Sequence, residues 1–265
     1  MLEGKVVIVT GGAKGIGKHA AKTFAQQKAK VVIADFDKGR LEKTSSELGQ
    51  FTDTLAINVD VRGEDDVKKM VDQVVNRFGQ IDVLVNDAAI VPHFAWGIPR
   101  WPRIRDMEKD FWDRVIQTNL GGTFLCTKHV LPHMEARRSG HIINLYGGGG
   151  VKPFGACAYV VTKDAIRTFT RYVAEEVREF NVRVIIFSPR VPIATEGAPE
   201  EALQRLPGPE ILGKGFVLAA GLPMDVTGQM FAYEDGKLVN EAYTVTPEAG
   251  QWQSTRESTS PSLTK

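Results

Sequence analysis

Six short apolar runs, separated by segments long enough for helices, constrain the fold of this chain more than any other feature. The runs lie at residues 6–9, 31–34, 55–59, 81–85, 142–145 and 182–187. Runs of this length without a regular polar alternation are typical of parallel strands that helices cover on both faces. We therefore expect an α/β fold, a doubly wound parallel sheet with right-handed crossovers, whose ligand binds at the carboxyl ends of the strands.

The clearest helical pattern follows Asp164. Apolar side chains recur there at helical spacing and leave Arg and Glu side chains for another face, so we expect a helix with a core-facing stripe. The apolar positions are Ala165, Ile166, Phe169, Val173, Val177 and Phe180.

The chain has 265 residues, which suits one α/β domain. We expect this domain to span residues 1–249, followed by a polar, Ser- and Thr-rich tail at 250–265. Residues 90–106 contain three prolines and two tryptophans without a clean period, which predicts an ordered loop over a sheet edge or a site. Residues 196–222 follow the sixth run and contain three further prolines, and we expect them to cover the substrate.

Charge and cysteine content narrow the classes of partner and compartment. A formal net charge of +1, with both signs interleaved, offers no basic footprint for nucleic acid or an anionic membrane, so we expect a small-molecule partner. Cys126 and Cys157 are too few for a disulfide framework, and we expect both to be inert core thiols. Because no basic leader precedes the first run and no apolar stretch reaches membrane-spanning length, we expect a cytoplasmic protein.

A glycine-rich stretch, Thr10 to Gly17 (TGGAKGIG), follows the first run directly and opens a helical pattern. Glycines let the backbone approach a pyrophosphate, and the helix N-terminus supplies free N–H groups and a favourable dipole. Asp35 ends the second run about 20 residues later, where a carboxylate accepts hydrogen bonds from ribose hydroxyls. This context predicts a dinucleotide site. The charge of Asp35 would repel a 2′-phosphate and favours NAD, whereas Lys14 leaves NADP open as the less expected cofactor.

Tyr159 and Lys163 are four residues apart, which makes them neighbours on one face of a helix. A nearby ammonium stabilises phenolate and lowers the pKa of tyrosine from about 10 toward neutrality. A general acid and base for alcohol oxidation needs such a pKa. The pair alone is common on solvated faces, but together with the glycine loop it predicts a catalytic site.

With both features in view, the sequence resembles the short-chain dehydrogenase/reductase (SDR) family, which has a Rossmann fold, over nearly its whole length. The resemblance implies hydride transfer between NAD(H) and a secondary alcohol or ketone. It also implies a homotetramer or homodimer, assembled through the helices around Asn119 and Tyr159. The motifs that carry it are the Thr10 to Gly17 loop, Asp35, Asp60-Val61, Asn119, Tyr159 with Lys163, and Thr227-Gly228 before the last strand.

The resemblance also implies roles for single residues. Tyr159 would transfer the substrate proton, Lys163 would lower its pKa and hold the nicotinamide ribose, and Asn119 would anchor a water in a proton relay. The other cofactor-binding positions would surround the phosphates, the adenine and the nicotinamide. They are Gly11, Lys14, Gly15, Ile16, Gly17, Asp35, Phe36, Asp60, Val61, Asn86, Ala88, Pro189, Ile193 and Thr195.

Two loops at the expected cofactor depart from the family pattern. The usual Asn-Asn-Ala-Gly after the fourth strand reads Asn86-Asp87-Ala88-Ala89 here, which adds a charge and a methyl group. The usual Pro-Gly after the sixth strand reads Pro189-Arg190, which puts a long cation near the expected cofactor.

The family's catalytic serine, which hydrogen-bonds the reacting oxygen, is missing from Asn144 to Gly150 (NLYGGGG). Alignment on Asn144 places Gly147 at the serine position, whereas the loop length to Tyr159 places Tyr146 there. Loss of one preorganised hydrogen-bond donor typically costs about 3 kcal/mol of transition-state stabilisation. Since enzymes typically lower the activation free energy by at least about 8 kcal/mol in total, this loss would weaken catalysis but not abolish it. We hypothesise that the Tyr146 hydroxyl replaces the serine as a fourth catalytic group.

Two other functions stay open from the sequence. A dinucleotide-binding sensor or structural protein with little hydride transfer is favoured by the missing serine and the altered loop after the fourth strand. Retention of Asn119, Tyr159 and Lys163 together favours the enzyme. A sugar-nucleotide epimerase or dehydratase would need a larger substrate domain than about 70 residues beyond the sixth run.

The aperiodic segments indicate the substrate only in outline. Residues 90–106 and 196–222 are apolar and aromatic, which predicts a hydrophobic or cyclic carbonyl compound. His129 and His133 have helical spacing without an evident third ligand, so we expect no metal.

Overall fold

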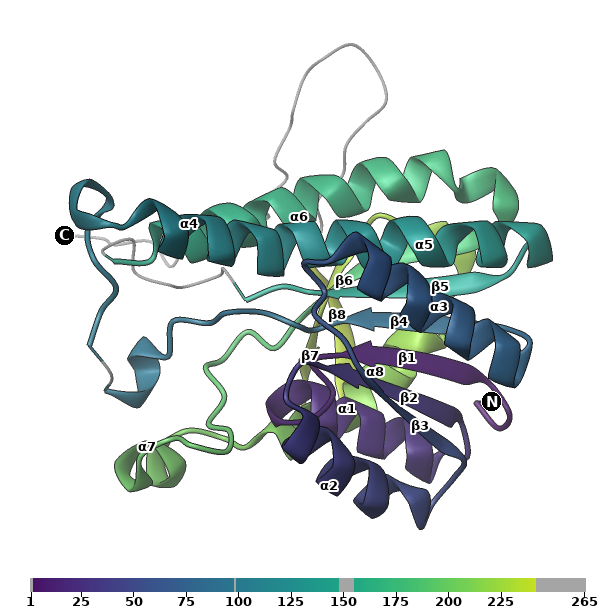
Figure 1. Ribbon diagram of the computed structural model, residues 1–265, viewed down its shortest axis with the longest axis horizontal. Coiled ribbons are helices and arrows are strands. Elements are labelled where there is room, and N and C mark those ends of the chain that lie inside the picture. The colour runs from purple at the N-terminus through teal and green to yellow at the C-terminus, as the bar shows by residue number, and fades with distance from the viewer. Residues whose placement is uncertain (1, 98, 148–154, 242–265) are drawn as a thin grey trace, which may run out of the picture.

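The computed structural model describes residues 2–97, 99–147 and 155–241, which form one eight-stranded sheet with helices on both faces (Figure 1). The strand order is β3-β2-β1-β4-β5-β6-β7-β8, with β1 to β7 parallel and β8 antiparallel to β7. Each predicted apolar run overlaps one of the strands β1 to β6, so the doubly wound α/β prediction is confirmed. The strands are β1 Val6–Thr10, β2 Lys30–Asp35, β3 Thr54–Asn58, β4 Val83–Asn86, β5 Gly140–Leu145, β6 Val182–Ser188, β7 Met230–Glu234 and β8 Lys237–Glu241.

The helices form a layer on each face of the sheet (Figure 1). Successive strand residues point to opposite layers. Val7 and Val9 of β1 join the core with α1, α2 and α8, whereas Val6 and Ile8 join the core with α3, α5 and α6. The helices are α1 Gly15–Gln26, α2 Lys38–Gly49, α3 Glu64–Phe78, α4 Lys109–Ile116, α5 Gly122–Arg137, α6 Cys157–Glu176, α7 Glu200–Arg205 and α8 Gly213–Ala220.

α6 confirms the helical pattern predicted after Asp164 and begins earlier, at Cys157, so that it includes Tyr159 and Lys163. The last predicted apolar position, Phe180, lies beyond α6 in a separate 3-10 turn. The same helix therefore builds the core and carries the candidate catalytic pair.

A second long helical segment runs beside α6. α4, a π-helical turn at Gln117–Gly121 and α5 follow one another without a gap. Asn119 lies in this turn and is 1% exposed. π-Turns inside helices are frequent at functional sites.

The described part of residues 90–106 contacts the chain after β6, both before and within the second aperiodic segment, at the carboxyl ends of the strands. Trp96 donates a hydrogen bond from Nε1 to the carbonyl of Ile193 at 2.9 Å, and Arg205 donates from Nη2 to the carbonyl of Ala95 at 2.5 Å. The described residues between 90 and 106 thus form a loop against the chain after β6. The predicted tail at 250–265 lies outside the described residues.

Strand β8 was not predicted from the sequence. β7 and β8 form a hairpin whose turn is Asp235-Gly236, with φ of 47° and 79°. An Asp-Gly pair with positive φ at both positions is a typical two-residue hairpin turn. This dipeptide was the available signal for an eighth strand.

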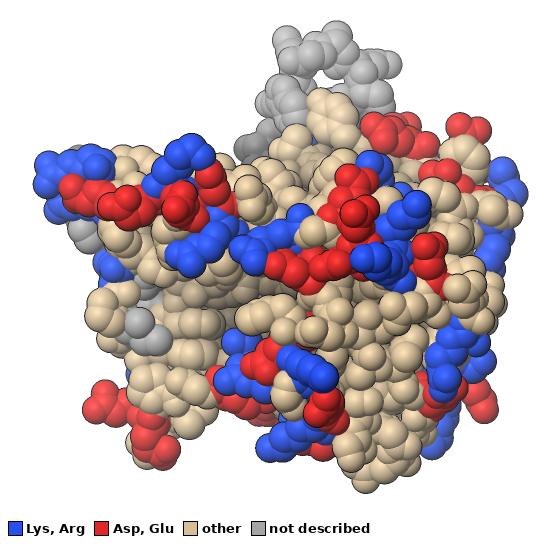
Figure 2. Space-filling model, in the orientation of Figure 1, with Lys and Arg blue, Asp and Glu red and all other residues tan. Residues whose placement is uncertain are grey.

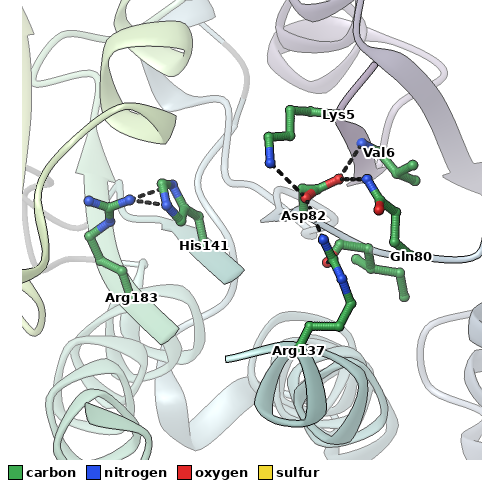
Figure 3. A network of polar contacts seen from close by, with 8 residues as sticks. Lys5, Val6, Gln80, Asp82, Arg137, His141 and Arg183 are labelled. Carbon is green, nitrogen blue, oxygen red and sulfur yellow. Dashed lines mark hydrogen bonds and ion pairs between the residues drawn. The ribbon is translucent and has the colours of Figure 1, made fainter. Parts of the chain in front are cut away.

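A polar network surrounds the buried Asp82 at the amino ends of the strands (Figure 3). Asp82 accepts hydrogen bonds from Val6 N at 2.8 Å, Lys5 Nζ at 3.1 Å and Arg137 Nη2 at 3.3 Å. Burial raises the pKa of Asp82, but these donors outweigh it and hold the pKa below its usual range. The network ties β1, β4 and α5 together at the end of the sheet opposite to the candidate site.

Positive and negative side chains are interleaved over the face shown in Figure 2. Within the described residues, no helix is long and apolar enough to cross a membrane.

Candidate active site

The glycine loop joins β1 to α1 in a conformation that needs glycine at defined positions. Gly11 has φ of 67° and Gly15 has φ of 57°, and side chains are strained in this region. A Cβ on Gly17 would lie 2.4 Å from the carbonyl oxygen of Gly11. Ile16 is partly buried and Lys14, the N-cap of α1, is exposed and makes no side-chain cap. The backbone fits a close approach by a dinucleotide phosphate.

Asp35 lies at the carboxyl end of β2, beside this loop, and is 6% exposed. Its Oδ2 accepts a hydrogen bond from Ala13 N at 3.2 Å, and its Oδ1 accepts one from Asp37 N at 3.0 Å. Phe36 follows it and is 74% exposed. The carboxylate thus orders the glycine loop and stands at the position expected for the ribose contact.

Asp60 and Val61 follow β3 at the same edge of the sheet. Asp60 accepts a hydrogen bond from Arg62 Nε at 2.9 Å, and this ion pair lowers the pKa of Asp60. Val61 is 7% exposed and packs against Gly122, where a Cβ would lie 2.6 Å from its side chain.

Asn86 begins a chain of buried hydrogen bonds that joins β4, β5 and the helices. Its Nδ2 donates to Asn144 Oδ1 at 2.8 Å and to Thr127 Oγ1 at 3.3 Å, and Asn144 in turn donates to Thr170 Oγ1 at 2.9 Å. This chain holds the carboxyl ends of β4 and β5 in register with α5 and α6.

Asp87 places a carboxylate between the glycine loop and α6. Its backbone N–H and that of Ala88 donate to Thr10 Oγ1, both at 3.2 Å. A Cβ on Gly17 would lie 2.7 Å from Oδ2 of Asp87. Burial raises the pKa of Asp87 to about 7, against the opposing effects of Lys163 and the Gly17 N–H. The departure from the family pattern therefore adds a titratable group to the site.

Asn119 uses its whole side-chain amide to hold neighbouring elements. Its Oδ1 accepts from Ile90 N at 2.7 Å, and its Nδ2 donates to the Ile90 carbonyl and to Thr162 Oγ1, both at 3.1 Å. Thr162 donates in turn to the carbonyl of Tyr159 at 2.7 Å. Asn119 thereby connects the loop after β4 to the turn of α6 that carries Tyr159. Thr162 was not singled out from the sequence.

Tyr159 and Lys163 lie one turn apart on α6 and are 5% and 3% exposed. Lys163 Nζ donates to the carbonyl of Leu145, at the end of β5, at 2.8 Å and lies 5.7 Å from the centre of the Tyr159 ring. Burial raises the pKa of Tyr159 above its ordinary value, and Asp87 and Tyr146 raise it further. Burial lowers the pKa of Lys163 to about 8, although Asp87 opposes this. The expected lowering of the Tyr159 pKa is not found, because desolvation of the phenol dominates.

Gly147, not Tyr146, stands against the Tyr159 hydroxyl. A Cβ on Gly147 would lie 2.4 Å from Tyr159 Oη. The Tyr146 hydroxyl donates instead to Asp164 Oδ1 at 3.1 Å, and Arg167 lies 5.8 Å from its ring centre. Of the two positions considered for the missing serine, Gly147, from alignment on Asn144, therefore fits this loop better than Tyr146, from loop length. The Tyr146 hydroxyl has a partner other than Tyr159.

The loop after β6 carries the remaining predicted residues. Pro189 and Thr195 are partly buried and Ile193 is 8% exposed. Arg190 has φ of 57°, and its guanidinium forms ion pairs with Glu234 at 2.6 Å and with Glu241. The β7–β8 hairpin therefore holds the guanidinium, and the expectation that it adds a cation near the cofactor stays a prediction.

The two cysteines differ in their surroundings. Cys126 is fully buried, and burial raises the pKa of its thiol to about 12. Cys157 is exposed at the start of α6, so the expectation of two core thiols is wrong for this residue. Within the described ranges, no group of three or more His, Cys, Asp or Glu side chains is arranged to hold a metal ion.

Comparison with known proteins identifies this arrangement. The family model described as short chain dehydrogenase matches residues 5–204. The chain belongs to the short-chain dehydrogenase family. The family consists of NAD(P)-dependent oxidoreductases that act on CH–OH groups, so the resemblance and the enzyme class are confirmed.

Individual short-chain dehydrogenases match most of the chain. Secoisolariciresinol dehydrogenase of Forsythia intermedia is 39% identical over 193 residues, which cover 71% of this chain and 66% of that protein, just under two thirds. The 3-oxoacyl-(acyl-carrier-protein) reductase FabG of Thermotoga maritima is 34% identical over 90% of this chain and 99% of its own length. The crystal structure of the 3-ketoacyl-(acyl-carrier-protein) reductase of Brucella melitensis, complexed with NADH, is 29% identical with a TM-score of 0.76, covering 88% of this chain and 97% of that chain.

Proposed function

We propose that the protein transfers a hydride between NAD(H) and a secondary alcohol or its ketone, with Tyr159 moving the substrate proton. The observation that carries the proposal is the hydrogen bond of 2.8 Å from Lys163 Nζ to the Leu145 carbonyl. It holds the buried lysine and the neighbouring phenol at the carboxyl end of β5. Ligands of doubly wound sheets bind at this edge.

The residues of α6 supply the proton chemistry. The bound nicotinamide would accept the hydride from an alcohol or supply it to a ketone. Because burial raises the pKa of Tyr159, the phenol is protonated at neutral pH and is ready to donate to a ketone oxygen. In the oxidative direction the phenol must first release its proton to solvent, and the resulting phenolate, which a nearby Lys163 ammonium favours, accepts the hydroxyl proton of the alcohol. Asn119 holds the turn that carries Tyr159 through Thr162.

We propose NAD rather than NADP as the cofactor. The buried carboxylate of Asp35 at the end of β2 supports this preference, because it would repel a 2′-phosphate. The exposed side chain of Lys14 offers only weak compensation. Asp35→Ser should narrow the ratio of the Kd values for NADP and NAD, and an unchanged ratio would argue against a role of Asp35 in cofactor choice.

We further propose that the protein is cytoplasmic and forms a homotetramer or homodimer. We propose that its domain spans residues 1–249 and that its substrate is a hydrophobic or cyclic carbonyl compound. Exposed apolar side chains on α5 and α6 support the assembly, namely Phe124 at 46% and Val161 at 45% exposure. Trp96 and Trp101, in the loop against the segment after β6, support an apolar substrate.

A dinucleotide-binding protein without turnover is the second candidate. The glycine at position 147, opposite the Tyr159 hydroxyl, favours it because the family's second hydroxyl donor is missing there.

The test is the change in nicotinamide absorbance with NAD(H) or NADP(H) and matched panels of secondary and cyclic alcohols and ketones. Wild type is compared with Tyr159→Phe and with Tyr172→Phe, an exposed tyrosine on the same helix, as control. We expect Tyr159→Phe to lose at least about 100-fold in kcat with an unchanged cofactor Kd. Cofactor binding without turnover by wild type would favour the second candidate, and absence of dinucleotide binding would refute both.

A further inference from the structure

One acidic side chain from the segment after β6 reaches the glycine loop. Glu196 Oε2 accepts a hydrogen bond of 2.7 Å from the backbone N–H of Gly15, the first residue of α1. Lys14 provides no side-chain cap, and the first turn of α1 contains no acidic residue. Glu196 therefore supplies the negative charge that a helix N-terminus favours.

The N–H of Gly15 belongs to the loop that a dinucleotide phosphate would occupy. A phosphate oxygen and a carboxylate oxygen seek the same donor, and the same helix dipole stabilises both. Their negative charges repel each other at hydrogen-bonding distance. The two groups therefore cannot share this N–H.

We propose that Glu196 is an internal competitor for the cofactor phosphate, so that it sets cofactor affinity and is displaced from Gly15 when the dinucleotide binds. The inference rests on the proposed function, since it assumes a dinucleotide in the glycine loop. It makes Glu196 a determinant of binding rather than a catalytic residue.

The surroundings of Glu196 allow this displacement. A cavity of about 400 Å³ lies beside it, lined in part by His19, Leu203 and Leu206, and gives the carboxylate room to leave Gly15. Glu196 itself is exposed, so water can solvate the displaced charge.

The same displacement would act on the segment that faces the candidate substrate site. Thr195, next to Glu196, lies against the glycine loop, since a Cβ on Gly15 would be 3.3 Å from its methyl carbon. Ala194 donates from its backbone N–H to the Pro207 carbonyl at 2.9 Å, which closes the segment into a loop. Release of Glu196 therefore removes one hydrogen bond that ties this loop to α1.

The test measures the Kd of ADP and of adenosine by titration calorimetry at low ionic strength. Wild type is compared with Glu196→Ala, with Glu196→Gln and with Glu201→Ala, which removes an exposed acid of the same segment. We expect Glu196→Ala to bind ADP about two- to tenfold more tightly, because an exposed charge at a helix N-terminus has a modest effect. Adenosine should bind all four proteins equally, since it carries no phosphate.

Glu196→Gln separates charge from packing. It keeps the size and an acceptor for Gly15, and it should tighten ADP binding even if Glu196→Ala fails to fold. If ADP binding is unchanged or weakened in the Glu196 variants, the proposal that Glu196 competes with the cofactor phosphate is overturned, whereas the proposed function stays intact. Absence of ADP and NAD binding in every protein overturns both.

Discussion

A Cβ atom on Gly147 would lie 2.4 Å from the hydroxyl oxygen of Tyr159. Unbonded atoms do not approach so closely, so a side chain at position 147 requires either the phenol or the backbone of residue 147 to shift. The glycine that replaces the family's serine therefore does more than remove a hydroxyl donor. It creates the space in which the Tyr159 hydroxyl lies.

This contact predicts that Gly147→Ala displaces the reacting hydroxyl. A misplacement of about 1 Å costs up to roughly 100-fold in rate, and we expect kcat to fall about 10- to 100-fold while the cofactor Kd changes little. Steady-state kinetics and cofactor titration check this. Gly147→Ser is the matched variant, because it adds the same Cβ and one donor, and it should be more active than Gly147→Ala. Wild-type turnover in Gly147→Ala would show that Tyr159 relaxes without consequence.

Tyr146→Phe tests whether Tyr146 replaces the missing serine. Because its hydroxyl donates to Asp164 at 3.1 Å, we expect kcat to stay within about threefold of wild type. The free energy of unfolding should fall by about 0.5–1.5 kcal/mol through the lost hydrogen bond. Urea denaturation and kinetics on the same preparation measure both quantities. A fall in kcat of about 100-fold would restore Tyr146 as the serine substitute.

Asp87→Asn should change how stability depends on pH. Burial raises the pKa of Asp87 to about 7, so the native state binds this proton more tightly than the unfolded chain does. As pH rises from about 4 to about 7, Asp87 ionises in the unfolded chain but stays protonated in the native state, and this difference lowers the free energy of unfolding of wild type. The free energy of unfolding of Asp87→Asn should therefore rise relative to that of wild type across this window, by roughly 1–3 kcal/mol near pH 7.

Asp60→Asn serves as a control, because its stability relative to wild type should change with pH in the opposite direction. Its ion pair with Arg62 lowers the pKa of Asp60, so the contribution of Asp60 to stability is present above the unfolded pKa and is lost as pH falls. Relative to wild type, Asp60→Asn should therefore lose stability as pH rises through about 4. Parallel pH profiles for the two variants would contradict the assignment for Asp87.

Arg190→Gly tests the second departure from the family pattern. Glycine would relieve the positive φ of 57° at this position but would lose the ion pairs with Glu234 and Glu241. These effects oppose each other, and we expect the free energy of unfolding to change by less than about 1 kcal/mol. The cofactor Kd should remain at the wild-type value, because the hairpin holds the cation. A several-fold change in Kd would place the guanidinium at the cofactor after all.

Features that depend on neighbours in the chain could be predicted from the sequence. The apolar runs predicted β1 to β6, because a strand buried on both faces needs no polar alternation. The spacing of Tyr159 and Lys163 placed them on one helix face, because residues four apart are neighbours on a helix. The glycine loop was recognised from its place between a strand and a helix. β8 was missed although its Asp-Gly turn was visible.

Only the tertiary structure decided which distant side chains meet. Gly147 rather than Tyr146 faces Tyr159, and Arg190 turns to the hairpin, because residues far apart in the chain define these surroundings. The raised pKa of Tyr159 likewise comes from burial among separate elements, whereas the sequence showed only the nearby lysine. Glu196 reaches Gly15 across 181 positions of the chain. Local patterns carry no information on such contacts, since packing of the complete fold determines them.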